Sequence, residues 1–249
     1  MFLSAEAVGL APALALAVAW LGARGGVSRP RLVLAKAGVV LVFVAFATEL
    51  QDLATHTFLW AHLLQNVVLA EWAPALLLLA VPRDLAARAA RFPLFRPLVA
   101  LPVWVATYYV WHLPVIYDAA LRRPHWLLHI EHLTYLLAGL CLWWPVIHGR
   151  HSAGAKAAYL FGAFVLASPL GLLLALIPRA IYSFYVDAAP ASGPSPLADQ
   201  QIAGVTMAAE EAIVFFGAFT AYLLRFLADE EASGAAQRRG RSSTGTPST

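Results

Sequence analysis

The 249-residue chain is 61% hydrophobic and only 12% charged, with a net charge of +3 at pH 7. A soluble domain needs more charged side chains to cover its surface, and a disordered chain needs low hydrophobicity with high charge. The composition therefore excludes a water-soluble enzyme and a disordered chain, and it predicts an all-α integral membrane protein. The single cysteine, Cys141, excludes an internal disulfide framework. No basic-aromatic surface pattern and no phosphate-binding loop is present, so neither nucleic acid nor nucleotide is an expected partner.

Seven segments are apolar and long enough to cross a bilayer as helices, which takes about 20 residues each. In chain order they are Glu6–Leu21, Leu34–Leu53, Phe58–Ala80, Leu98–Ile116, Trp126–Ile147, Lys156–Ile177 and Ile202–Leu227. The alternative is six spans, with Met1–Leu21 removed as a signal peptide. No Lys or Arg precedes this first apolar run and no small-x-small cleavage site ends it, so seven spans are predicted.

The Lys and Arg residues are distributed unevenly between the two sets of connecting segments. Fourteen follow the first, third, fifth and seventh spans, and three, Arg122, Arg123 and Arg179, lie on the other side. By the positive-inside rule, the N-terminus is outside and the C-terminus is cytoplasmic. Residues 1–228 then form one membrane domain. Residues 229–249 are polar and aperiodic, and we expect a disordered cytoplasmic tail.

Histidines gather at the predicted outer end of this bundle. Six of the eight lie there, namely His56, His62, His112, His125, His129 and His132. Polar side chains inside a membrane are costly and mark functional sites, and imidazole is the commonest metal ligand. His129 and His132, spaced i, i+3, share a helix face. The simpler interpretation is that such histidines are hydrogen-bonding anchors at the interface, and that Glu71 and Glu210 are neutral, hydrogen-bonded glutamates.

We therefore predict a metal site in the outer leaflet, built from side chains on several helices. The predicted ligands are His62, His112, His129, His132 and Met207. The possible accessory residues are His56, Asn66, Asp118, Glu131 and Asp199. Several imidazoles with one thioether and no thiolate favour copper over zinc.

Four segments, in this order, resemble motifs of the polytopic CtaG-type cytochrome c oxidase assembly proteins. They are AHLLQNVVLAEWAPALLLLAVP (Ala61–Pro82), WHLPVIYDAAL (Trp111–Leu121), HIEHLTYLLAGLCLWWPV (His129–Val146) and DQQIAGVTM (Asp199–Met207). The resemblance implies a non-enzymatic, multi-pass protein of the bacterial plasma membrane. It also implies that the protein supplies copper to the catalytic subunit of a haem–copper oxidase. The residues that match the family positions are His62, Gln65, His112, His129, His132, Asp199 and Met207. Asn66 departs from the pattern, because the family has a histidine there.

Two rival functions are open to the same residues. A membrane electron-transfer protein would hold haem between one histidine on each of two facing helices, and His62 and His112 lie at similar depths. A copper transporter would need ligands stepping across the bilayer. The inner half offers few of them, namely Cys141, Glu71 and the loop histidines His148 and His151. An assembly factor that binds copper near the outer surface is the preferred interpretation.

Overall fold

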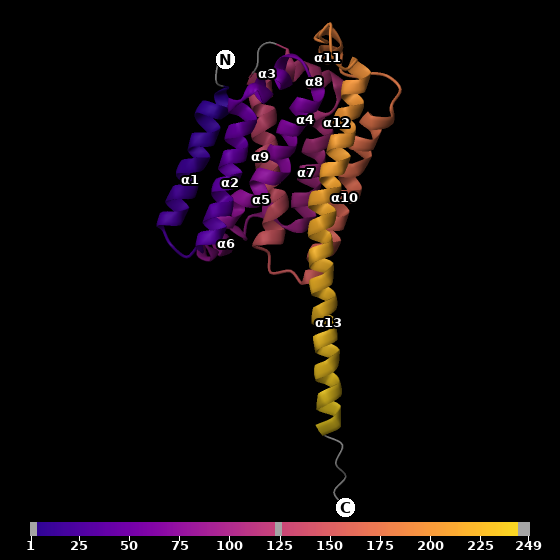
Figure 1. Ribbon diagram of the computed structural model, residues 1–249. Helices are drawn as coiled ribbons and strands as arrows, with labels where there is room; N and C mark the ends of the chain where they lie inside the picture. Colours follow the sequence, from indigo (N-terminus) through magenta and orange to yellow (C-terminus); the bar gives the residue numbers. More distant parts are fainter. Residues whose placement is uncertain (1–3, 123–125, 244–249) are drawn as a thin grey trace, which may run out of the picture.

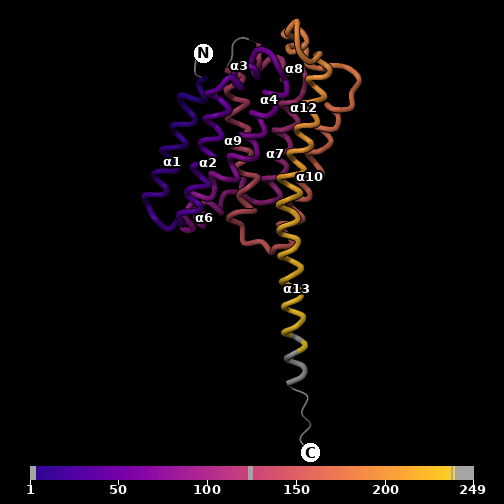
Figure 2. Tube along the Cα trace, viewed as in Figure 1, coloured from indigo at the N-terminus to yellow at the C-terminus, as the bar shows by residue number. Residues whose placement is uncertain are grey.

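The computed structural model describes residues 4–122 and 126–243, and all regular elements within these ranges are helices (Figures 1 and 2). His125, one of the six outer histidines, and Arg123 lie outside the described residues. Within these described residues, six helices are long and apolar enough to cross a membrane, and a bent pair gives a seventh candidate. The predicted fold class, a helical bundle with the character of a membrane protein, is confirmed.

The elements fall into groups that correspond to the predicted spans. The first three groups are η1 (Glu6–Leu10) with α1 (Ala11–Ala23), then α2 (Arg29–Ala47) with α3 (Glu49–His56), and then α4 (Leu59–Val67), η2 (Val68–Trp72), α5 (Ala73–Leu77) and η3 (Leu78–Ala80). Next come α6 (Arg83–Ala89), η4 (Pro93–Phe95), α7 (Pro97–Trp111), α8 (Pro114–Leu121) and α9 (Trp126–Ile147). The chain ends with α10 (Ala153–Leu176), α11 (Ser183–Asp187), α12 (Pro196–Glu211), η5 (Ala212–Phe216) and α13 (Gly217–Ser243).

The second span lies earlier in the chain than the predicted Leu34–Leu53. The backbone of Thr48 is extended, with φ −115° and ψ −178°, so α2 stops at Ala47 and a separate helix, α3, begins at Glu49. The Thr48 hydroxyl caps the new helix by accepting a hydrogen bond from the Leu50 N–H at 3.4 Å. The polar residues of α3 therefore lie at the end of the bundle rather than inside the span.

The fourth span also ends earlier than predicted, at Trp111 rather than Ile116. Proline disfavours the helical conformation in the residue before it, and Leu113, which precedes Pro114, is extended. As a result α8 is bent by 72° from α7, and His112 lies at the break. Hydropathy alone did not predict this bend, because both halves are apolar.

The last helix runs past the predicted end of the seventh span. We expected a disordered tail from residue 229, but α13 continues as a helix to Ser243 and projects beyond the bundle (Figure 1). Most residues in this stretch are Ala, Glu, Gln or Arg, which favour helix.

The two ends of the bundle carry different short elements. Helices α3, α8 and α11 lie at one end, where α1 also begins, whereas α6 lies at the other end, from which α13 emerges (Figure 1). Between these ends the helices approach closely at small residues. Gly139 of α9 packs against the Ala70 backbone of η2, where a Cβ would overlap the carbonyl group. The polar side chains of α9 are thereby held against the third span.

Candidate metal site

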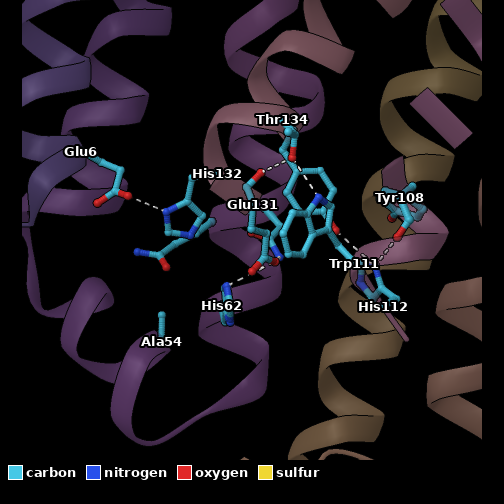
Figure 3. A network of polar contacts seen from close by, with 12 residues as sticks. Glu6, Ala54, His62, Tyr108, Trp111, His112, Glu131, His132 and Thr134 are labelled. Atoms are coloured by element: carbon cyan, nitrogen blue, oxygen red, sulfur yellow. Dashed lines mark hydrogen bonds and ion pairs between the residues drawn. The ribbon is translucent and has the colours of Figure 1, made fainter. Parts of the chain in front are cut away.

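One carboxylate joins two histidines at the end of the bundle where α1 begins. A single oxygen of Glu6, Oε1, lies 2.7 Å from His129 Nδ1 and 2.8 Å from His132 Nδ1 (Figure 3 shows the second contact). One potential ligand atom from each residue lies within 4.8 Å of the others. Glu6 and His132 are buried, while the His129 side chain is 46% exposed. The group therefore offers two nitrogens and one oxygen, and it is accessible from one side.

The local structure of the first helix fixes the position of Glu6. Glu6 begins η1, a π-helical turn, a type of turn often found at functional sites. Just before it, the Ser4 hydroxyl donates to the Phe46 carbonyl at 3.0 Å and accepts from the Ala7 N–H at 3.1 Å. These contacts tie the start of the helix to the end of α2.

His62 lies beside this group on the third span. Its ring centroid is 5.9 Å from that of His132, and both side chains are fully buried. Its Nε2 is 3.7 Å from Oε1 of Glu131, and the same Glu131 oxygen accepts a hydrogen bond from Asn66 Nδ2 at 3.0 Å (Figure 3). Nε2 of His62 and Nε2 of His132 have no hydrogen-bond partner among the described residues, so each ring has a nitrogen free for another ligand.

A tyrosine of α11 sets the protonation pattern of His62. Burial raises the pKa of the Tyr185 hydroxyl well above its ordinary value, so the group remains a donor, and it donates to the Ala54 carbonyl at 2.5 Å. Its oxygen then accepts from the N–H at His62 Nδ1, 3.0 Å away. Neutral His62 therefore has an unprotonated Nε2, which is the form that binds a metal.

His112 belongs to a neighbouring part of the network. Its Nδ1 is 2.7 Å from the Tyr108 carbonyl oxygen and 3.2 Å from the Tyr135 hydroxyl. The fully buried ring of Tyr117 lies 5.0 Å from the His62 ring and 5.8 Å from the His112 ring, measured between centroids. The Tyr117 ring therefore packs against both histidines.

Three of the predicted accessory residues have structural partners instead. Asp199 accepts hydrogen bonds from the Leu59 and Trp60 N–H groups at 2.7 and 3.3 Å, and so joins α12 to the start of α4. Asp118 accepts from the backbone and hydroxyl of Ser183 and holds α11. His56 pairs with Asp52 at 3.3 Å on the exposed surface of α3.

Met207 lies deeper than the histidines. Asp199 is level with Leu59, so at 1.5 Å per residue Met207 is about 12 Å below that level and His62 about 4.5 Å. Met207 is buried against α10 at Gly171. The structure thus brings His62, His129 and His132 together and places Met207 in a packing interface.

Glu6 was not among the site residues predicted from the sequence. The sequence feature that could have identified Glu6 is that it is an ionisable residue in the first turn of an apolar span, with no basic residue near it in the sequence. Of the two deeper glutamates considered in the sequence, Glu210 accepts a hydrogen bond from Trp72 Nε1 between η2 and α12, as the simpler interpretation expects. Both oxygens of Glu71 lack a partner among the described residues. Tyr108 donates to Glu211 at 2.7 Å.

The fold and the site together define a polytopic helical membrane protein with a histidine–carboxylate group at one end. Residues 13–229, most of the chain, match the family model of the cytochrome c oxidase caa3 assembly factor (Caa3_CtaG), and the protein belongs to this family. The match confirms the family that the sequence motifs indicate. No curated protein and no solved structure matches the chain. The three clustered histidines lie within the matched residues, whereas Glu6 precedes them.

Proposed function

We propose that the protein binds copper at Glu6, His129 and His132 and passes it to the catalytic subunit of a haem–copper oxidase during assembly. The observation that supports this most directly is the single Glu6 oxygen shared by two imidazole nitrogens, at 2.7 and 2.8 Å. Imidazole nitrogens suit copper as well as zinc, iron and nickel, and a role in oxidase assembly favours copper among these metals. The role is binding and release, not catalysis.

The group is suited to transfer because its ligand shell is open. His129 is half-exposed, so ligands of a partner protein have a path to the metal. Element η1, which carries Glu6, continues into helix α1, which lies at the edge of the bundle and packs mainly against α2 (Figure 1). A small movement of α1 would remove one ligand and leave the rest of the bundle in place. His62 Nε2, free and next to His132, is a candidate fourth ligand.

We further infer seven spans in a bacterial plasma membrane, with the site near the outer surface. Two observations support this topology. The Lys and Arg residues are divided fourteen to three, and α1 begins at the end of the bundle opposite the one that α13 leaves (Figure 1). A copper-accepting subunit could then dock beside His129 from within the membrane.

The test is the copper content of protein purified without a chelator. Wild type and His148→Ala should retain copper, whereas His129→Ala and His132→Ala should lose most of it, because the remaining ligands cannot close the shell. An absorption spectrum of the same samples would identify haem by its Soret band. Haem instead of copper would favour the electron-transfer alternative.

The transfer step is tested separately in a deletion strain that expresses each variant. At limiting copper, oxidase activity should be restored by wild type and His151→Ala but not by His129→Ala or His132→Ala. If the two outer variants, present at normal levels by immunoblot, restored full activity, the proposed site would be wrong. The outer histidines would then be interfacial anchors.

A further inference from the structure

The end of the bundle opposite the metal site contains a basic cavity of about 810 Å³. Five arginines line it, contributed by α2, by α6, by the segment between α6 and α7, and by the segment between α9 and α10. They are Arg31, Arg83, Arg91, Arg96 and Arg150, and two histidines, His148 and His151, lie beside them. No Asp or Glu is among the lining residues. The cavity is therefore strongly positive.

These guanidinium groups have no internal counter-charge. In residues 4–122 and 126–243, none of the five lies within 4.0 Å of a carboxylate oxygen, although Arg24 and Arg122 elsewhere both do. Like charges that share a cavity repel one another, and a bound anion removes that repulsion. Arginine also matches phosphate geometry, because its planar group donates two parallel hydrogen bonds.

Stacked aromatic rings form part of the cavity lining. Trp144 stacks on Phe95 with ring centroids 4.0 Å apart, and His148 packs on Trp144 at 4.9 Å. Burial, together with the positive charges of Arg31 and Lys156, lowers the pKa of His148, so its ring is neutral near pH 7. Its Nε2–H then donates to the Leu78 carbonyl at 2.9 Å. His148 therefore contributes an uncharged side chain to the lining, and the arginines supply the positive charge.

The surroundings of the cavity point to a membrane lipid rather than a free ion. Phe92 and Leu94, next to Arg91 and Arg96, are 53% and 51% exposed, and Leu98 is 90% exposed. Such apolar side chains beside a basic cavity fit an acyl chain next to a phosphate. The volume lies within the range of small-molecule sites.

We propose that this cavity binds the phosphate group of an anionic membrane lipid. Basic pockets between membrane helices recognise such headgroups, and each arginine near the headgroup contributes a similar increment of affinity. The site is separate from the proposed copper site, since its residues come from the opposite ends of the helices. It would tie the segment between α6 and α7 to the bilayer surface.

The experiment is native mass spectrometry of the full chain in detergent, titrated with phosphatidylglycerol, phosphatidylcholine or inorganic phosphate. The test variant is Arg91→Gln/Arg96→Gln. The control is Arg88→Gln/Arg225→Gln, which makes the same charge change outside the cavity lining. Phosphatidylglycerol should bind wild type and the control alike, and it should bind the test variant about 30-fold more weakly. All the exchanged arginines except Arg225 are on exposed linker or short-helix positions, so folding should be preserved.

Three outcomes would overturn the proposal. If the control variant lost as much affinity for phosphatidylglycerol as the test variant, the effect would be one of general surface charge. Equal affinity for phosphatidylcholine would mean that the anionic charge is not recognised. Binding of inorganic phosphate that displaces the lipid would make the occupant a free anion. Thermal unfolding of both double variants, compared with wild type, separates loss of the site from loss of the fold.

Discussion

The role of Glu6 can be tested by Glu6→Gln, which keeps the shape of the side chain and removes its charge. In the structure one Glu6 oxygen contacts both imidazoles, and no second carboxylate from the described residues belongs to this three-residue group. A neutral amide is a poor copper ligand, and even the loss of an outer-shell partner costs about 10- to 100-fold in metal affinity. We therefore expect copper affinity to fall about 100-fold, or about 2.7 kcal/mol.

The assay is a competition titration of purified protein against a chromophoric copper chelator. Glu49→Gln is the matched control, because Glu49 is an exposed glutamate on α3 at the same end of the bundle. The control should bind copper as wild type does. If Glu6→Gln bound copper within about twofold of wild type while His132→Ala did not, Glu6 would not be a ligand. The short contacts would then be hydrogen bonds that only orient the histidines.

Three further predictions concern stability. Asp199→Asn should cost about 1 kcal/mol in the free energy of unfolding, because it weakens the link to the start of α4, and it should leave the copper content unchanged. Gly139→Ala should cost about 1–3 kcal/mol, since its Cβ would overlap the Ala70 backbone, whereas Gly217→Ala, with nothing within 4 Å, should be neutral in thermal unfolding. Burial lowers the pKa of His148 in the folded state below its ordinary value of 6.5. Protonation of this ring is therefore less favourable in the folded than in the unfolded protein, and the free energy of unfolding should decrease as the pH falls below 6.5. His148→Gln should unfold with a shallower pH dependence than wild type, and an identical dependence would contradict this assignment.

The membrane character of the fold was predictable because it depends on composition and on the length of apolar runs. The boundaries of two spans were not. Thr48 and Pro114 change the backbone direction inside or beside apolar sequence, and a hydropathy window averages over both. The helical continuation of α13 was missed for a related reason. The polar composition of the chain after residue 228 predicts disorder, although most of the polar residues up to Ser243 are helix formers.

The site was predictable only where its residues are close in the sequence. The i, i+3 spacing of His129 and His132 places both on one helix face, and the structure brings both to the same oxygen. Glu6 is 123 residues away from His129, and no local pattern predicts that η1 brings the Glu6 side chain to that face. His112 was grouped with His62 by depth alone, but depth does not reveal that the Tyr117 ring packs against both of them.

Asn66, at a position where the family resemblance predicts a histidine, has a specific consequence for the proposed site. Its amide donates to Glu131, and the same Glu131 oxygen lies 3.7 Å from His62 Nε2. An uncompensated cation is costly in the membrane interior, so a buried metal needs anionic partners as well as nitrogens. Glu6 beside His132 and Glu131 beside His62 place one carboxylate next to each of the two adjoining rings. The Asn66 amide thus holds the Glu131 carboxyl group beside His62. With copper bound as proposed, Glu131 would offer an oxygen beside His62 in addition to the Glu6 oxygen beside His132.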